Sequence, residues 1–119
     1  MKAPFYKSVG YALCGIKDCI VKERNIKIHL AIMSLVIIFG FLLHISLQEW
    51  IVCLLLFGMV IALELVNTAI EAIVDLCSPE YHRLAKYAKD VGAGAVLVMA
   101  FFAAIIGLII FLPRILGIF

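Results

Sequence analysis

Five polar residues recur at helical spacing within an otherwise apolar stretch in the second half of the chain: Glu64, Asn67, Thr68, Glu71 and Asp75. An α-helix turns by about 100° per residue, so all five side chains are predicted to share one face roughly 100° wide. A polar stripe this narrow on an apolar helix points to a protein interior or a water-filled crevice. This polar stripe is therefore the first place to look for chemistry.

Carboxylates on such a face suit two kinds of chemistry. A buried carboxylate such as Glu64 can act as a general base on a hydroxyl group. A carboxylate near water, paired with one from another segment, can hold Mg²⁺, which prefers oxygen ligands and substrate phosphates. The alternative is that these residues only tie helices together by hydrogen bonds. That alternative suits Thr68 better than Glu64 or Glu71, because a carboxylate is costly where Gln would serve.

The composition indicates what surrounds the polar stripe. Of the 119 residues, 66% are hydrophobic and 15% are charged, and the mean hydropathy is +1.21. Soluble domains average about 45–50% apolar and about 25% charged residues, so soluble globular and disordered classes are excluded. The 10 basic and 8 acidic residues give a net charge of +2, which is too balanced for a nucleic-acid partner. The sequence predicts a small integral membrane protein, which would need to oligomerise to enclose a site.

Three apolar segments are long enough to cross a membrane. Residues 28–47 and 91–112 contain no Asp, Glu, Lys or Arg, and about 20 helical residues cross one hydrocarbon thickness. The second span is predicted over residues 50–76, joined to the first by a tight hairpin. Pro113 and Arg114 are expected to end the third span. The expected fold is therefore all-α, with three transmembrane helices.

The depth of the polar stripe follows from helix geometry. If Trp50 marks the outer interface, Glu64 lies ~21 Å along the second span and Glu71 lies ~10 Å further. Glu64 is then still inside the hydrocarbon, whereas Glu71 reaches the cytoplasmic boundary. The polar stripe is thus expected to connect the membrane interior with the cytoplasm.

Two segments outside the spans carry most of the charge. Residues 1–27 repeat apolar residues on one helical face, which predicts an amphipathic helix on the membrane surface; a solvated basic tail is the alternative. Basic residues gather there and in residues 77–90 and are absent from the hairpin. The positive-inside rule therefore places both segments and the N-terminus in the cytoplasm. Ser78-Pro79 indicates a helix start. The apolar face of the first segment consists of Phe5, Val9, Ala12, Leu13, Ile16 and Ile20.

The other polar residues are weaker signals. His29 and His44 fall within the first span and are expected to be hydrogen-bonded bystanders rather than ligands. The four cysteines show no metal-binding or redox spacing and are interpreted as apolar filler. Neither of the two glycine-rich nucleotide motifs, GxxxxGK[ST] and GxGxxG, is present. The residues alone leave a lipid-modifying enzyme and a small proton-coupled transporter subunit equally open.

The polar stripe resembles a known signature. Residues 64–75, ELVNTAIEAIVD, are similar to the signature of the prokaryotic diacylglycerol kinase family, and Ala88-Lys89-Asp90 with the following Gly94-Ala95-Val96 match in order and spacing. The resemblance covers nearly the whole chain. It implies a homotrimeric integral membrane kinase of the bacterial cytoplasmic (inner) membrane, with composite sites at subunit interfaces. Its substrates would be Mg²⁺-bound ATP and a membrane lipid.

The resemblance also implies roles for individual residues. Glu64 matches the catalytic base that accepts the proton of the lipid hydroxyl, and Asn67 lies beside it. Glu23 and Glu71 match the carboxylates that hold Mg²⁺ on the ATP phosphates. The positions that match nucleotide contacts are Tyr11, Glu80, Tyr81, His82, Lys89 and Asp90.

The resemblance is closer to one branch of the family. Several stretches are more similar to the Gram-positive undecaprenol kinases than to the diacylglycerol kinases, so undecaprenol is the expected acceptor and diacylglycerol the alternative. An arginine that the family carries near the start of the surface helix has no clear counterpart; Pro4 falls there, and Lys7 is the nearest basic residue. The branch-specific stretches are Glu23-Arg24-Asn25 with His29, Glu49-Trp50, Leu63-Glu64-Leu65, residues 82–86 and residues 106–113.

Overall fold

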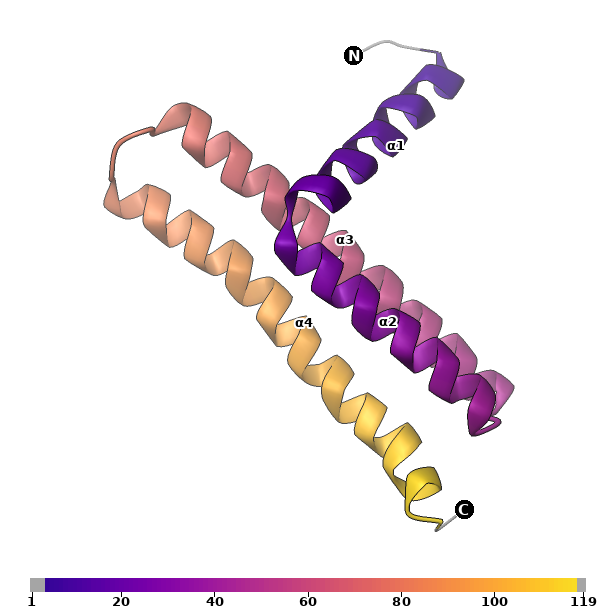
Figure 1. The fold of residues 1–119 in the computed structure, drawn as a ribbon. Helices are drawn as coiled ribbons and strands as arrows, with labels where there is room; N and C mark the ends of the chain where they lie inside the picture. Colours follow the sequence, from indigo (N-terminus) through magenta and orange to yellow (C-terminus); the bar gives the residue numbers. More distant parts are fainter. Residues whose placement is uncertain (1–3, 118–119) are drawn as a thin grey trace.

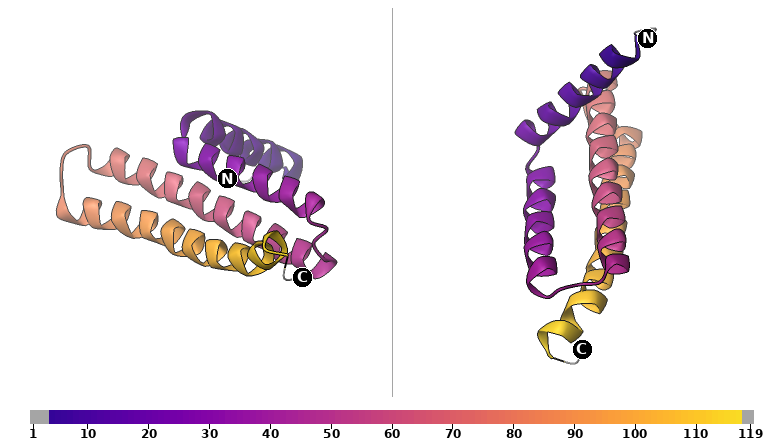
Figure 2. Two further views of the ribbon diagram at one scale, coloured as in Figure 1. Left: turned by 60° about the horizontal axis from the view of Figure 1, so that its bottom comes forward. Right: turned by 90° about the vertical axis from the view of Figure 1, so that its right-hand side faces the viewer.

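The computed structural model describes residues 4–117, in which α-helices are the only regular secondary structure. Its helices are α1 (Phe5–Lys22), α2 (Arg24–Leu42), α3 (Leu47–Cys77) and α4 (Arg83–Ile115). Helices α2, α3 and α4 run alongside one another, whereas α1 leaves them at an angle (Figures 1 and 2). Each of α2, α3 and α4 is long and apolar enough to cross a membrane. The prediction of an all-α chain with three apolar spans is confirmed.

Helix α3 is the element against which the others pack. It contacts α4 along much of its length, α2 over a shorter stretch, and the end of α1. Within the described chain, α2 and α4 make little direct contact with each other. The long polar stripe of α3 therefore lies where the other helices can reach it.

A sharp corner at Glu23 separates α1 from α2. Glu23 has an extended backbone (φ −97°, ψ 127°), and its N–H still donates to the carbonyl of Cys19 at 2.9 Å. Next to this corner, Ile26 is fully buried and Cys19 is 7% exposed, so apolar packing holds the corner against α3. Residues 1–3 of the expected surface helix lie outside the described range. The corner leaves the Glu23 side chain half-buried and close enough to Glu64 of α3 for the two charges to interact.

The hairpin between α2 and α3 is closed by local hydrogen bonds. Ser46 and Glu49 form a capping box, in which the Glu49 N–H donates to Ser46 Oγ at 3.2 Å and the Ser46 N–H donates to Glu49 Oε1 at 2.9 Å. Gly40 lets α2 approach Trp50 closely, since a Cβ there would lie 2.5 Å from the indole ring. The hairpin therefore fixes the register of α2 against α3.

The connection between α3 and α4 differs from the expectation. The Ser78-Pro79 pair was expected to start a helix, but α4 begins at Arg83 and His82 is its N-cap, with Nδ1 accepting from the Leu84 N–H at 3.1 Å. Ser78 Oγ instead donates to the Glu80 carbonyl at 2.9 Å, which turns the chain before the helix starts. The expectation of a helix start at Ser78-Pro79 is wrong because this local hydrogen bond competes with helix initiation.

Helix α4 extends slightly past the predicted third span. Pro113 and Arg114 were expected to close that span, and the helix itself continues through both to Ile115. A proline removes one backbone donor near a helix end. Pro113 therefore has no N–H to donate to the Ile109 carbonyl, and Arg114 Nη1 donates to the neighbouring Ile110 carbonyl at 3.2 Å. Arg114 also forms a bidentate ion pair with Glu49, in which Nη1 lies 2.7 Å from Oε2 and Nη2 lies 2.7 Å from Oε1.

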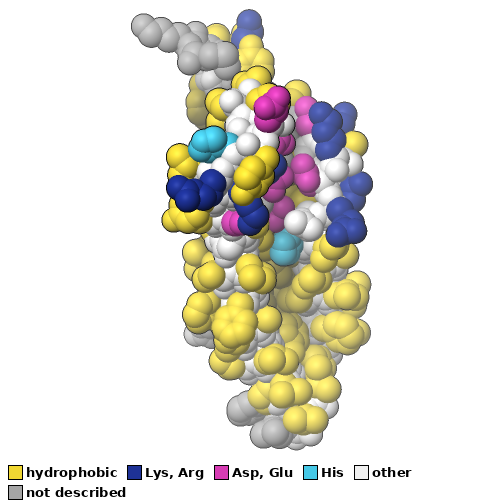
Figure 3. All heavy atoms as spheres, turned by 90° about the vertical axis from the view of Figure 1, so that its left-hand side faces the viewer, with side chains coloured by type: hydrophobic (Ala, Val, Ile, Leu, Met, Phe, Trp, Pro, Cys, Tyr) yellow, Lys and Arg dark blue, Asp and Glu magenta, His cyan; other side chains and the backbone are white. Residues whose placement is uncertain are grey.

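Charged and apolar side chains are segregated along the molecule. Lys, Arg, Asp and Glu gather at the end that holds the α3–α4 connection and the α1–α2 corner, and the other part of this face is apolar (Figure 3). The separation is the one expected of a chain whose apolar part faces lipid and whose charged part faces water.

The ion pair between Arg114 and Glu49 should contribute to stability. Both side chains are less than a quarter exposed, at 22% and 24%. We expect Arg114→Ala to lower the free energy of unfolding by about 1–3 kcal/mol, because it removes two charge-assisted hydrogen bonds between α3 and α4. The measurement is thermal unfolding of the protein in detergent micelles.

A matched control is Lys86→Ala. The ion pair of Lys86 with Asp90 is just as short, at 2.6 Å, but its side chains are 61% and 62% exposed, so its loss should change stability by less than about 0.5 kcal/mol. Equal melting temperatures for the Arg114→Ala and Lys86→Ala variants would contradict the assignment.

Candidate active site

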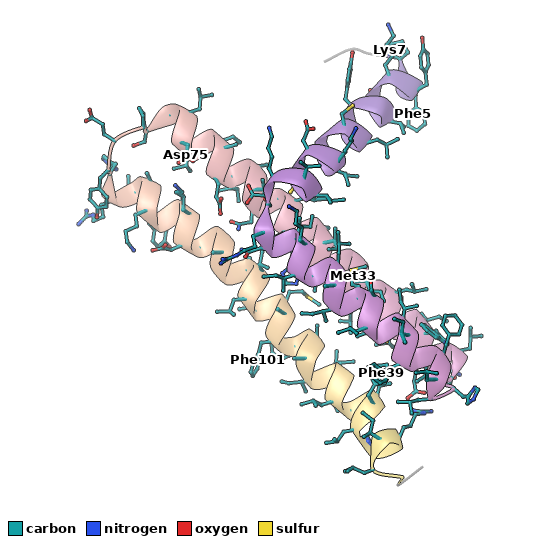
Figure 4. All side chains as sticks on the ribbon, in the orientation of Figure 1. Phe5, Lys7, Met33, Phe39, Asp75 and Phe101 are labelled. Carbon is teal, nitrogen blue, oxygen red and sulfur yellow. The ribbon has the colours of Figure 1, made fainter. Side chains whose placement is uncertain are left out.

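The polar stripe passes from the interior of the molecule to its surface. Glu64 is 2% exposed and Asn67 is 4% exposed, Glu71 is half-buried, and Asp75 is exposed near the α3–α4 connection (Figure 4). All four lie on the one continuous helix α3. The exposure of the polar stripe therefore increases along α3, from the buried carboxylate of Glu64 to the exposed carboxylate of Asp75.

Four helices meet around the buried end of the polar stripe. Thr68 Oγ1 donates to the Glu64 carbonyl at 3.0 Å, and Cys19 Sγ of α1 donates to Thr68 Oγ1 at 3.5 Å. His29 Nε2 of α2 lies 3.7 Å from Glu64 Oε2. Gly92 of α4 approaches Asn67 so closely that a Cβ there would lie 2.5 Å from Asn67 Oδ1. Every helix of the fold therefore contributes to the surroundings of Glu64.

The residues Glu23, Glu64, Asn67 and Glu71 form what we call the carboxylate centre. Asn67 Nδ2 donates to Glu71 Oε1 at 3.3 Å. Two buried atoms of the centre, Glu64 Oε2 and Asn67 Oδ1, have no hydrogen-bond partner. Buried polar atoms are almost always paired, and an unpaired one calls for an explanation such as a bound water, an ion or a catalytic role. These two atoms can therefore bind a further polar group.

The charges of the carboxylate centre are unbalanced. The carboxylates of Glu71 and Glu23 lie close enough to that of Glu64 to repel it, and among residues 4–117 the basic side chain that faces Glu64 is His29. Within residues 4–117, no three His, Cys, Asp or Glu side chains lie close enough to hold a metal on their own. Mg²⁺ is usually held by one or two carboxylates together with substrate phosphates and water. Glu23 and Glu71 fit that pattern, and a cation between them would relieve the repulsion.

A polar pocket of about 410 Å³ lies at the α3–α4 connection. We call it the connection pocket. It brings together five of the six residues expected to contact a nucleotide, and its remaining lining includes Asp75, at the exposed end of the polar stripe. These five residues are Glu80, Tyr81, His82, Lys89 and Asp90.

Two ion pairs lie in the wall of the connection pocket. Lys89 Nζ lies 2.8 Å from Asp75 Oδ1, and Lys86 Nζ lies 2.6 Å from Asp90 Oδ2. Both pairs are exposed enough to exchange partners at low cost. The two lysines can therefore exchange their carboxylate partners for an anionic ligand in the pocket.

Tyr11 does not line the connection pocket. It lies on α1 with 55% of its surface exposed, and α1 leads away from the other helices (Figures 1 and 4). The sixth expected nucleotide contact is thus separated from the other five within one chain.

An apolar cavity of about 250 Å³ lies between α2, α3 and α4. Met33 and Phe57 line it from α2 and α3, and small residues of α4 such as Ala103 and Gly107 form its other wall. A second apolar hollow, between α2 and α4, extends past Phe39 of α2 (Figure 4). Because α2 and α4 barely touch, an apolar chain can lie between them.

His29 is the residue that the sequence interpretation undervalued. It was expected to be a bystander, yet it faces Glu64 and is the only residue with a side-chain nitrogen or oxygen among those lining the apolar cavity. A signal was available, because His29 shares the helical spacing of Ile32, Met33 and Val36, which line the same cavity. A histidine on the inward face of a span is therefore placed to contact polar groups of the neighbouring helices.

Comparison with known proteins identifies the family. The model of the prokaryotic diacylglycerol kinase family matches residues 10–111. The chain belongs to this family. It is therefore a multi-pass membrane lipid kinase, which implies ATP as phosphoryl donor, and this displaces the transporter alternative.

Three relatives of this lipid kinase are informative. Undecaprenol kinase of Bacillus subtilis (strain 168) is 49% identical over 92% of this chain and 89% of its own length. A diacylglycerol kinase of Synechocystis sp. is 41% identical over 92% of this chain and 63% of its own length. Diacylglycerol kinase of Escherichia coli (strain K12) is 29% identical over 83% of this chain and 81% of its own length.

The contact between Gly92 and Asn67 can be tested directly. In Gly92→Ala the added Cβ would lie 2.5 Å from Asn67 Oδ1, so Asn67 must move and its bond to Glu71 is disturbed. We expect lipid kinase activity to fall by about tenfold or more, since small displacements in a reacting site are costly. The measurement is phosphate transfer from ATP to lipid in mixed micelles.

Gly94→Ala is the matched control on the same helix. A Cβ at Gly94 meets nothing within 4 Å, and Ala favours the helical state over Gly. This variant should keep its activity, and its melting temperature should stay the same or rise. Full activity in the Gly92→Ala variant would show that the close approach has no part in the reaction.

Proposed function

We propose that the protein is an undecaprenol kinase, which transfers the γ-phosphate of ATP to undecaprenol and forms undecaprenyl phosphate. The observation that carries the choice of acceptor is the 49% identity to undecaprenol kinase of Bacillus subtilis, against 41% and 29% to two diacylglycerol kinases. The alternative is a diacylglycerol kinase that forms phosphatidic acid. Both reactions would use the same carboxylate centre.

In the proposed reaction, Glu64 is the general base and Asn67 supports it. The lipid hydroxyl approaches Glu64 Oε2, which is buried and has no hydrogen-bond partner. The hydroxyl oxygen bonds to the γ-phosphorus, the bond from this phosphorus to the bridging oxygen of ADP breaks, and the hydroxyl proton passes to Glu64. Positioning and charge neutralisation supply most of the catalysis in such transfers.

Glu23 and Glu71 would hold Mg²⁺, which neutralises charge on the transferring phosphate when it is bound. Both carboxylates are half-buried, and both lie close enough to Glu64 for their charges to interact with its carboxylate. Glu71 is also oriented by Asn67 Nδ2 at 3.3 Å. These two residues would thus place the phosphate end of the nucleotide next to the base.

The connection pocket is the proposed nucleotide site. Lys89 and Lys86 offer positive charge to phosphate groups, and both now bind exposed carboxylates that a stronger anion can replace. Asp75 belongs to the connection pocket as well as to the polar stripe. A nucleotide in the pocket can therefore extend along α3 towards Glu71. Tyr11, separated on α1, would complete such a site from a neighbouring subunit.

The protein would act as a homotrimer in a membrane, and its apolar surface suits such surroundings. Large apolar residues remain exposed along α2, α3 and α4, which suits contact with lipid and with other copies. On α1, Phe5 is 84% exposed and Leu13 is 60% exposed, so α1 presents an uncovered apolar face that would rest on the membrane surface. The basic residues near the α1–α2 corner and the α3–α4 connection favour a cytoplasmic N-terminus in the bacterial cytoplasmic membrane.

The acceptor can be tested by comparing two lipids. The purified protein in mixed micelles with radiolabelled ATP should phosphorylate undecaprenol with a clearly higher turnover than diacylglycerol. The reason is that its sequence follows the undecaprenol branch of the family. Equal or greater turnover of diacylglycerol would overturn the choice of undecaprenol and leave the lipid kinase activity intact.

Glu64→Gln tests the proposed base. The amide keeps the shape of the side chain but accepts a proton poorly, so turnover should fall by about a hundredfold or more, whereas binding of MgATP should stay largely intact. Kinase assays and equilibrium binding of MgATP measure the two effects.

Glu71→Gln is the matched comparison, two turns along the same helix. It should raise the Mg²⁺ concentration needed for half-maximal activity, because it weakens a proposed metal ligand. Near-normal turnover in the Glu64→Gln variant would remove Glu64 from the role of base. An unchanged Mg²⁺ requirement in the Glu71→Gln variant would remove Glu71 from metal binding.

A further inference from the structure

We propose that His29 binds the acceptor lipid by donating a hydrogen bond from Nε2 to the hydroxyl oxygen that is phosphorylated. This inference rests on the proposed function, in which Glu64 accepts the proton of that hydroxyl. It assigns a substrate-binding role to a residue that had been interpreted as a bystander.

His29 stands at the boundary between apolar and acidic surroundings. Its side chain is 18% exposed, whereas that of Glu64 is 3% exposed. On its other side it lines the apolar cavity of about 250 Å³, whose other lining residues carry no nitrogen or oxygen in their side chains. A lipid whose hydrocarbon lies in this cavity must bring its polar end past His29 to reach Glu64.

The distance between the two side chains suits a shared ligand. His29 Nε2 and Glu64 Oε2 are 3.7 Å apart, which is too far for a direct hydrogen bond. An oxygen atom at about 2.8 Å from each of them can bridge this gap. Glu64 Oε2 is buried and lacks a partner, so a bridging hydroxyl would satisfy it.

The other polar groups near Glu64 are already engaged. Thr68 Oγ1 donates to the Glu64 carbonyl rather than to its carboxylate, Cys19 Sγ donates to Thr68, and Asn67 Nδ2 donates to Glu71. In the part of the chain that the structure describes, His29 is the side chain that lies next to Glu64 Oε2 with its nitrogen still available. The acceptor hydroxyl therefore has His29 and Glu64 as its two neighbours.

The proton positions balance in this arrangement. With a proton on Nε2, His29 donates to one lone pair of the hydroxyl oxygen, and the hydroxyl proton is donated to Glu64 Oε2. The second lone pair attacks the γ-phosphorus as its bond to the ADP oxygen breaks. The hydroxyl proton ends on Glu64, and His29 keeps its own proton throughout.

Steady-state kinetics of His29→Ala and His29→Gln test the proposal. Loss of one hydrogen bond to the acceptor should lower kcat/KM for undecaprenol by about tenfold, mainly through a higher KM for the lipid, and leave the KM for MgATP unchanged. Gln carries an amide nitrogen near the position of Nε2, so His29→Gln should recover most of the loss. If His29→Ala does not fold, His29→Phe keeps the volume of the ring without the donor and takes its place.

Ser34→Ala is the matched control on α2. Ser34 is exposed, and its Oγ donates only to the Leu30 carbonyl of its own helix, so both KM values should match those of the unchanged protein. The proposal is overturned if the donor-free variant keeps a normal KM for the lipid, whether or not its kcat falls. It is also overturned if His29→Gln is as impaired as His29→Ala, or if the KM for MgATP rises equally. Absence of any lipid product from the unchanged protein would instead refute the proposed function, and the role of His29 with it.

Discussion

Keeping the Glu64 carboxylate away from water costs several kcal/mol unless something compensates for it, and the arrangement of the helices follows from this constraint. The end of α1, the start of α2 and the Gly92 surface of α4 all close around one turn of α3. They exclude water from Glu64 without supplying its Oε2 atom with a hydrogen bond. The Oε2 atom is thus left without a partner, as the proposed role of Glu64 as general base requires.

The two sides of the carboxylate centre differ in the ligands that they suit. On one side, the cavity between α2, α3 and α4 offers apolar walls with His29 at its polar end. On the other side, the connection pocket offers lysines and carboxylates near water. A lipid kinase must bring together a substrate from the membrane and one from the cytoplasm. The polar stripe of α3, graded from buried Glu64 to exposed Asp75, lies between these two surroundings.

The opposite end of the molecule limits how far the helices can separate. The close approach of Gly40 to Trp50 and the Glu49–Arg114 ion pair hold the ends of α2 and α4 against the start of α3. The apolar cavity and the apolar hollow between α2 and α4 thus lie between this fastened end and the carboxylate centre.

The sequence by itself determined the three apolar spans and the shared face of Glu64, Asn67 and Glu71, because helical periodicity and the cost of charge in a membrane are local properties of the chain. Its local signals misjudged the start of α4, where Ser78 bonds to its neighbours. Only the tertiary structure decided that Gly92 touches Asn67 and that His29 faces Glu64, since both contacts join different helices. Such contacts depend on helix rotation and packing, which no single segment of sequence specifies.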